Sequence, residues 1–544
     1  MFSSLSPVHV RLCGLMFLAA LAAPVHGQSP GADVRGEVFV GSEVEDYLRL
    51  LQLTGHAPLY PWSIRSFSPA EVDRLLPTDS AHPWAGRYDL RPDSSGGPQF
   101  SWVRPQGRMV YNSAFPYGLN DGAVWAGRGV TASLQTGFAA RYGPVSLTVA
   151  PLVFWAENRE FELQKNGQKG QLVYAAGGFF PESIDLPQRF GADPVTRIDP
   201  GQSTLRVDLA GVAAGISTAN QHWGPARVSP ILLGSQGPGF AHAFAGTARP
   251  IDLWIGRAHG RLVWGRLEES AYSPVAADAA GRVMAGIVGT FTPRGAPGIE
   301  LGVARFYHYA SPSGALPPGY LLRPLETFVK AGTKDPYDQD AVEENQLASV
   351  FFRAVFPGSQ VEMYGEYSRD DHNFDLRDFL LEPDNSRAFL VGLSKAWPRS
   401  PTNVFVLSGE LAHAQIPSLA RIRNQSFFYT HHSVRQGHTN RGQLLGSPMI
   451  AFSGGGATVG ADYYTPLGRW SLGWQRMIRQ NTLNTIIDDP SRPQDAYHIV
   501  RGEAVRFIGR WELLAEAMGV YNRHRYMQDD AFNLGATLGV STSW

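Results

Sequence analysis

From about residue 107 to the end of the chain, apolar and polar residues alternate with a period of two. The final stretch, AFNLGATLGVSTSW, places Phe532, Leu534 and Leu538 on one side of an extended strand and small residues such as Gly535 and Ser541 on the other. Side chains alternate across a strand with this period. The same pattern recurs in TLRVDLA, QVEMYGEYSRD, RWSLGWQRMIRQ and RWELLAEAMGVY. It predicts a mainly β protein whose strands have one apolar and one polar face.

The alternation alone leaves two architectures open. A soluble sandwich or propeller turns its apolar faces inward, whereas a membrane barrel turns them outward toward lipid. The chain is 43% hydrophobic and contains 13 Trp, 20 Tyr and 29 Phe. No stretch beyond the amino-terminal region approaches the ~18 consecutive apolar residues of a membrane helix. The composition therefore fits either a large soluble β fold or a membrane barrel.

The connections favour the barrel. We expect strands at about 107–115, 125–141, 144–157, 203–211, 213–221, 250–257, 261–268, 281–293, 297–310, 347–357, 360–370, 386–397, 402–415, 455–464, 468–479, 498–507, 509–521 and 531–544. Short connections such as RYGP, RAHG, FPGS and TPLG alternate with long ones such as 158–202, 223–248 and 416–453. Outer-membrane barrels have short periplasmic turns and long outer loops.

These ranges give about 18 strands, an even number as in single-chain bacterial barrels. The last strand must pair with the first to close such a sheet and remove its edges. The terminal Trp544 resembles the carboxy-terminal aromatic signature of proteins delivered to the outer-membrane barrel assembly machinery. We therefore expect a transmembrane antiparallel barrel over residues 106–544 with lipid as its outer partner.

The amino terminus reads as a secretory signal over residues 1–27. It has one cation, Arg11, then an apolar run and small residues before Gln28, so we expect cleavage near Gly27–Gln28. The only cysteine, Cys13, lies in this segment, which leaves the mature chain without disulfides. Removing the segment changes the net charge from −1 to −2, a balance that argues against nucleic acid as a partner. We expect the mature protein in the bacterial outer membrane.

Residues 28–105 have a different, helical pattern. In GSEVEDYLRLLQLTG, Ser42 and Glu45 have capping-box spacing and Gly55 supplies a carboxy-terminal cap. In SFSPAEVDRLL, Ser68 is the expected cap, Pro69 is the first helical residue, and Glu71 stands three residues after the cap. Since an even strand count brings both ends of the barrel to the periplasmic face, we expect this segment to plug the barrel there.

Two stretches resemble a known family. NQHWGPARVSPILLGSQGPGFAHAF (220–244), together with the helical stretch from Gly41 to Leu76, resembles the Wzi-type capsule assembly proteins. His222 and Ala226 depart from that pattern, which tends to have Trp and Gly at these positions. The resemblance implies an 18-stranded barrel closed by helices below and loops above, without catalytic activity. It also implies a cell-surface lectin that binds or organises exported, capsular or extracellular polysaccharide.

The loop at 416–453 carries the candidate binding residues. Its arginines could pair with carboxylates of an acidic polysaccharide through their planar forks, and its aromatic residues could stack on sugar faces. The candidates are Arg421, Arg423, Arg435, Arg441, Phe427, Phe428 and Tyr429. The alternative is a loop that folds inward so that its cations satisfy carboxylates of the lumen.

Other candidates have a structural alternative that we favour. Trp223, followed by Gly224 and Pro225, could contact a ligand or could anchor a rigid loop. Neighbouring His431 and His432 point opposite ways in an extended loop, and no Cys accompanies them or His438, so we expect no metal site. We expect Arg206, Arg479, Glu362 and Glu512 to form a polar ladder in the lumen.

Three other functions are weighed against the lectin. A diffusion porin or polysaccharide channel would use the polar lumen. An outer-membrane lipase would need catalytic Ser and His, but the chain has no Gly-x-Ser-x-Gly elbow. A soluble exported protein acting on glycans would not remain with the membrane. We expect a monomeric, non-enzymatic protein with no catalytic residues, no cofactor and no metal.

Overall fold

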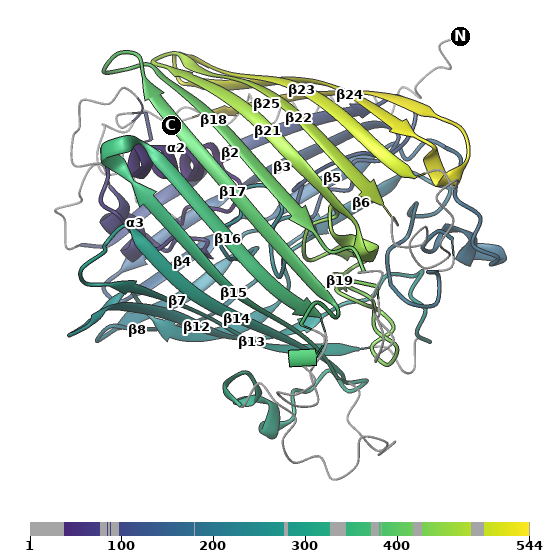
Figure 1. Cartoon of the computed structure of the whole chain (residues 1–544), viewed down its shortest axis with the longest axis horizontal. Helices are drawn as coiled ribbons and strands as arrows, with labels where there is room; N and C mark the ends of the chain where they lie inside the picture. Colours follow the sequence, from purple (N-terminus) through teal and green to yellow (C-terminus); the bar gives the residue numbers. More distant parts are fainter. Residues whose placement is uncertain are drawn as a thin grey trace.

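The computed structural model describes residues 37–76, 84, 87–88, 97–178, 180–276, 281–326, 344–370, 380–381, 383–416, 427–479 and 494–542. Its main feature is a closed antiparallel barrel (Figure 1). The barrel has 18 spans, three of which are divided into two shorter strands (β4 and β5, β6 and β7, β10 and β11). The predicted fold class is therefore confirmed.

The barrel strands follow one another around the wall in chain order. They are β2 (Gln99–Asn112), β3 (Gly129–Tyr142), β4 (Val145–Val149), β5 (Leu152–Ala156), β6 (Val195–Asp199), β7 (Thr204–Leu209), β8 (Val212–Ser217), β10 (His242–Thr247), β11 (Ile251–Leu253), β12 (Gly256–Leu267), β13 (Arg282–Pro293), β14 (Ile299–Ala310), β15 (Glu344–Phe356), β16 (Val361–Asp370), β17 (Arg387–Pro398), β18 (Val404–His413), β21 (Gly455–Thr465), β22 (Gly468–Arg479), β23 (Asp495–Ile508), β24 (Trp511–Arg523) and β25 (Ala531–Thr542). β25 pairs with β2 from Gln106 opposite Ser541 to Asn112 opposite Gly535, which closes the sheet.

The exposure of side chains on the two faces of the wall distinguishes a membrane barrel from a soluble sandwich. On β22, Trp470 and Leu472 are 59% and 62% exposed on the outside of the barrel. Inward-facing Arg206 and Glu362 are 4% and 0% exposed. Apolar side chains thus face outward and charges face the interior, the reverse of a soluble sandwich and the arrangement of a membrane barrel.

Two helices lie inside one end of the barrel (Figure 1). α2 (Glu43–Thr54) begins at Ser42, whose Oγ accepts a hydrogen bond from the Glu45 N–H, and ends at Gly55 with φ 79°. α3 (Pro69–Leu75) begins with the predicted capping box of Ser68 and Glu71. Both predicted helices are confirmed. No helix within the described ranges is long and apolar enough to cross a membrane.

The helices occupy the end where the short turns lie. α2 contacts the turn η4 (Pro357–Ser359) and strands β15 and β17. Its apolar face, with Leu48 and Leu51, packs in one core with wall residues such as Val404 and Phe507. Burying each such side chain contributes on the order of 1.5–3 kcal/mol. This helical plug, residues 37–76, is therefore attached to the wall by apolar packing as well as by the polar contacts described below.

Three spans differ by several residues from the sequence-based expectation. The span expected at 203–211 begins at Val195, because β6 and β7 together form it and β6 lies in the stretch expected as the long connection 158–202. The strand expected at 250–257 is wrong, because β10 and β11 together form that span and the turn falls at Trp254–Ile255, so that RAHG lies inside β12. Arg249–Pro250 interrupts the span and hides its alternation. β2 begins at Gln99 rather than near 107, since a register shift between Val103 and Gln106 breaks the period of two.

Long connections at the other end fold into the barrel. The connection at 218–241 reaches the plug, where its short strand β9 (His222–Trp223) pairs with β1 (Ile64–Arg65) of the plug segment. Residues from this connection share an apolar core with residues of 427–454, including Ile231, Leu232, Tyr429 and Ile450. The described part of the barrel is therefore filled from both ends.

Candidate functional site

A cavity of about 700 Å³ remains in the lumen between the plug, the outer connections and the wall. Its walls carry both signs of charge. The charged residues that line it include Glu43, Asp46, Arg108, Asp121, Arg227, Asp462, Arg469, Arg501, Glu503 and Glu512. This lumen cavity is large enough for a ligand of several sugar-sized units, since small-molecule sites span ~300–1,000 Å³.

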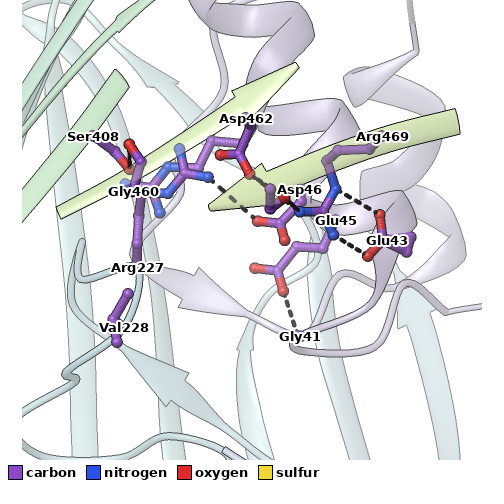
Figure 2. Close-up of polar contacts among 12 residues, drawn as sticks. Gly41, Glu43, Glu45, Asp46, Arg227, Val228, Ser408, Gly460, Asp462 and Arg469 are labelled. Atoms are coloured by element: carbon purple, nitrogen blue, oxygen red, sulfur yellow. Dashed lines mark hydrogen bonds and ion pairs between the residues drawn. The ribbon is translucent and has the colours of Figure 1, made fainter. Parts of the chain in front are cut away.

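Arg469 of β22 organises the charges on the plug side of the cavity. Figure 2 shows its guanidinium facing Glu43 of α2, with N–O distances of 2.5 and 3.2 Å. The same side chain lies 3.2 Å from Asp462 and 2.7 Å from Glu503. Nearby, Arg227 pairs with Asp46 at 3.7 Å. Arg469 thus contacts three carboxylates, of which Glu43 belongs to the plug and Asp462 and Glu503 belong to the wall.

Glu43 has an altered acidity in this setting. Burial raises the pKa of Glu43 to about 7, and the charge of Arg469 offsets only part of that effect. Glu503 and Asp46 raise the pKa further because they are negatively charged. The Glu43 carboxyl, which joins plug and wall at this point, therefore changes its protonation state near neutral pH.

Two further ion groups join plug and wall inside the lumen. Arg49 of α2 and Arg353 of β15 share the carboxylate of Glu362, with Nε–Oε1 distances of 3.0 and 2.6 Å. All three side chains are at most 3% exposed. A buried ion pair of this kind stabilises a structure only when its members stay paired. These residues therefore hold the plug in register with the wall.

The second group is centred on Glu71 of α3. His259 Nε2 lies 3.1 Å from its Oε1, and Arg206 and Arg261 lie 3.8 Å from its Oε2. Burial alone would raise the pKa of Glu71, but the hydrogen bond and charge of His259 and the two arginines hold it well below its usual range. Glu71 is therefore an anion at neutral pH.

Wall carboxylates also accept hydrogen bonds from backbone N–H groups of the filling segments. Glu300 accepts from the N–H groups of Trp62 and Ser63 at 2.8 and 3.0 Å. Glu410 accepts from the N–H groups of Arg227 and Ser229 at 2.8 and 2.7 Å. The polar ladder of the lumen thus satisfies irregular backbone that is buried away from water.

Trp223 lies in the interior. It is fully buried, packs against Phe306 at 6.1 Å between ring centroids, and is paired with Ile64 across the β1–β9 ladder. Gly286 of the wall makes room for it, since a Cβ there would come within 2.6 Å of the Trp223 ring. In this position Trp223 anchors the connection at 218–241. A glycan contact by Trp223 stays a prediction.

His222 lies next to it at the junction with the plug. Burial lowers the pKa of His222 well below its usual value, and the charges of Arg65 and Arg49 lower it further. His222 is therefore a neutral side chain packed against cationic ones.

The predicted aromatic residues of the 416–453 loop pack inward. Phe428 and Tyr429 are 1% and 0% exposed. Tyr429 donates its backbone N–H to Asp370 at 2.7 Å and its ring stacks on His438. Phe427 is half-buried and packs on Phe180 at 5.1 Å. Stacking of these rings on sugars is not tested by this arrangement and stays a prediction.

The predicted arginines of this loop separate into different environments. Arg441 pairs with Asp199 at 2.7 Å and with Glu268 at 2.6 Å, as expected for an inward-folded loop. Arg435 is 43% exposed, donates to the backbone oxygen of Glu182 at 2.9 Å and lies 4.0 Å from the exposed carboxylate of the same residue. Arg421 and Arg423 lie outside the described residues. Of the two arginines of this set that the structure describes, Arg435 has the more solvent-exposed side chain, at 43% against 24% for Arg441.

The histidines of the loop do not converge on a metal. His438 Nδ1 lies 2.8 Å from His308 Nε2, and its Nε2 lies 2.5 Å from the backbone oxygen of Leu232. Burial lowers the pKa of His438 to about 3. Within the described ranges, no group of three His, Cys, Asp or Glu side chains is placed to hold a metal ion.

Sequence reasoning identified one side of each ion group and missed the other. It placed Arg206 and Glu362 in the lumen but did not connect them to Arg49 and Glu71 of the plug. Glu71 was recognised only as a helix cap, and it performs both roles because Ser68 N–H and Oγ bond one oxygen while His259 reaches the other. The only signal in the sequence for such ion pairing is a charged side chain on a helical face that the pattern predicts to be buried.

Comparisons with known proteins find a similar fold but no matching family model or curated sequence. The structure is similar to that of Wzi of Escherichia coli, described as an outer-membrane protein involved in group 1 capsule assembly and as a carbohydrate-binding β-barrel. The TM-score is 0.64 and the identity 16%, over 94% of this chain and all of that one.

Two porin structures are also similar, at lower scores. OccK2 of Pseudomonas aeruginosa covers 82% of this chain and 96% of its own, with 9% identity and a TM-score of 0.41. A BenF-like porin of Pseudomonas fluorescens covers 82% and 98%, with 11% identity and a TM-score of 0.40. At 16% identity, the likeness to Wzi shows that the two chains share an outer-membrane barrel fold over nearly their whole lengths.

Proposed function

We propose that this protein is a non-enzymatic outer-membrane barrel that binds exported polysaccharide at the cell surface through its outer loops. The observation that carries the proposal is the filling of the lumen from both ends. The plug is joined to the wall by buried ion groups, and the connections at 218–241 and 427–454 pack into a common core. A barrel filled in this way is suited to holding a ligand on its loops rather than passing it.

The likeness to Wzi supports the same proposal, because that barrel is described as carbohydrate-binding. The arrangement of Arg435 supports it in part, since an exposed guanidinium can form a bidentate contact with a carboxylate. Arg421 and Arg423 belong to the same loop and remain proposed contacts. The partner that this chemistry selects is an acidic polysaccharide.

A diffusion channel is the second candidate, and the lumen cavity favours it. The cavity has a volume of about 700 Å³ and polar walls, as an aqueous path would require. The ion groups around Arg469 and Glu362 would then be gates or selectivity elements. Conductance distinguishes the two functions.

The experiment is a binding measurement with the purified, detergent-solubilised full chain and a panel of acidic and neutral polysaccharides. The test variant changes Arg421, Arg423 and Arg435 to Ala and leaves Arg441 in place, because Arg441 is ion-paired. The control is Arg399→Ala, which removes an exposed arginine from a short turn at the opposite end of the barrel.

We expect saturable binding of acidic polysaccharides by the wild type and by Arg399→Ala, and at least tenfold weaker binding by the triple variant, since each lost charge-assisted contact removes on the order of 1.5 kcal/mol. Absence of binding to every polysaccharide, with the barrel still folded, would reject the proposal in favour of the channel.

A further inference from the structure

A second, smaller cavity lies among the outer connections. It has a volume of about 240 Å³ and is bounded by the connections at 113–128 and 157–194, the segment at 442–452, and the ends of β22 and β23. We call it the loop pocket and define it by Trp125, Gln164, Gln443, Arg479 and Tyr497. Tyr117, Asp121 and Val124 line both this pocket and the lumen cavity, so the two are neighbours.

One buried polar atom in the pocket wall is unsatisfied. The side chain of Gln443 is 8% exposed, and its Nε2 donates to the backbone oxygen of Gly122 at 3.2 Å. Its Oε1 is buried and accepts no hydrogen bond from any described residue. Buried side-chain acceptors are nearly always paired, because an unpaired one destabilises the fold. Gln443 lines the pocket, and an unpaired acceptor on such a residue is suited to a hydroxyl group that enters the cavity.

Arg479 supplies a cation whose donors are only partly used by the described residues. Its Nη1 donates to the Tyr497 hydroxyl at 3.3 Å, and a guanidinium carries five N–H donors. Asp495 lies opposite Arg479 in the β22–β23 register, but its oxygens accept from Asn522 Nδ2 at 2.6 Å and from the Tyr526 N–H at 3.2 Å. Arg479 forms no ion pair with a residue that the structure describes, so it can accept an external carboxylate.

The other charged groups near the pocket are already committed. Arg525 lies between the rings of Phe115 and Tyr526, 4.0 and 4.3 Å from their centroids. Its donors reach Tyr497 at 3.2 Å and Asn522 at 3.3 Å. Asp121 pairs with Arg108 at 2.6 Å. Arg479 is therefore the charged group that determines what the loop pocket selects.

The remaining walls combine aromatic faces with amides. Tyr117 and Tyr497 are stacked at 6.5 Å and 29°, and the half-buried Trp125 packs edge-on against Phe190. The half-buried side-chain amide of Gln164 makes no hydrogen bond with a described residue. Flat apolar walls with a few polar groups that fix orientation are typical of small-molecule sites.

We infer that the loop pocket binds one acidic sugar residue of a polysaccharide, with Arg479 holding its carboxylate and Gln443 Oε1 accepting one of its hydroxyl groups. The inference rests on the proposed function and names a site and a sugar class for it. The pocket is smaller than the ~300–1,000 Å³ of sites for drug-sized ligands, so it accommodates a single ring of a longer chain.

The test uses the full chain in detergent, titrated with trigalacturonic acid and, separately, with neutral maltotriose. The variants are Arg479→Gln and Gln443→Leu, and the control is Arg476→Gln, an arginine on the same strand but of the outward parity shared by Trp470 and Leu472. Gln443→Leu removes the unsatisfied oxygen and also the donor to the Gly122 backbone oxygen, so its folding is compared directly with that of the wild type. A heat-modifiable gel band verifies folding of each variant.

We expect trigalacturonic acid to bind more tightly than maltotriose, about tenfold weaker binding by Arg479→Gln, and several-fold weaker binding by Gln443→Leu. Arg476→Gln should stay within twofold of the wild type. Polysaccharide binding that is unchanged in both pocket variants would overturn the inference and leave the proposed function standing. Absence of binding to any glycan by the wild type would overturn both.

Discussion

At the scale of single residues, the interior of this barrel is organised by carboxylates and guanidinium groups that join distant parts of the chain. Glu362 is shared between Arg49, which is 313 residues away in the sequence, and Arg353. A buried charge destabilises the fold when it has no partner, and a buried ion group stabilises the fold only when all its members are paired. The position of the plug therefore depends on a few side chains whose partners lie on another element.

Glu362→Ala should weaken this attachment strongly. The change leaves Arg49 and Arg353 buried without a counter-charge, which costs about 3–5 kcal/mol in comparable buried pairs. We expect protease cleavage within residues 37–76 of the folded barrel, which the wild type resists. Glu162→Ala, at an exposed loop carboxylate, is the control and should remain resistant. Equal resistance of Glu362→Ala and the control would show that the ion group does not hold the plug.

Glu43 should make stability depend on pH. Its carboxyl ionises near pH 4.5 in the unfolded chain and near pH 7 in the folded one, so the folded chain binds more protons between these values. Its contribution to the free energy of unfolding is complete below about pH 4.5 and falls as the pH rises through 7, by at most about 3 kcal/mol. Glu43→Gln removes this proton equilibrium.

The measurement is the unfolding temperature of both proteins between pH 4.5 and 8. Between these limits, the wild type should lose stability relative to Glu43→Gln as the pH rises. Parallel pH profiles for the two proteins would contradict the raised pKa of Glu43.

At the scale of elements, the junction between plug and outer connection is the most informative. β1 of the plug pairs with β9, and the Gly224 N–H donates to the Ser63 oxygen at 3.0 Å. Gly224 has a φ of 95°, and a Cβ there would lie 2.5 Å from Glu366 Oε2. Glycine is required at this point both by backbone conformation and by the close approach of the wall.

Gly224→Ala should therefore loosen this junction. The backbone conformation alone costs an alanine about 1–2 kcal/mol, and the contact with Glu366 adds to that. We expect faster hydrogen exchange in residues 61–67 and 222–233 of the variant. Gly295→Ala, where a Cβ meets open space, is the matched control and should exchange like the wild type. Unchanged exchange in Gly224→Ala would mean that the junction tolerates a side chain.

Local patterns in the sequence predicted the elements, while the site depends on contacts that no local pattern encodes. Ser42, Glu45 and Gly55 mark the ends of α2 within one short stretch, and they were recognised. The span of β10 and β11 was misplaced because Arg249 and Pro250 interrupt the alternation. Gln443 has no sequence signal as a pocket residue, since its unsatisfied oxygen results from the packing of distant loops.

At the scale of the whole molecule, the barrel has an outer surface rich in exposed apolar side chains. Its interior is occupied by its own chain, including the helices at one end (Figure 1). The plug enters from the end with short turns, and the long connections enter from the other. The spaces left among the described residues include the lumen cavity of about 700 Å³ and the loop pocket of about 240 Å³. This division of space favours a protein that retains a polysaccharide on its loop end.

The proposed function requires that the filled barrel hold polysaccharide and not conduct. The most direct test is single-channel recording of the full mature chain in a planar bilayer, with insertion verified by labelling. We predict no stable conductance steps, because the plug and the inward connections occupy the path. Large, long-lived steps from the wild type would contradict the account and identify the lumen cavity as part of a channel.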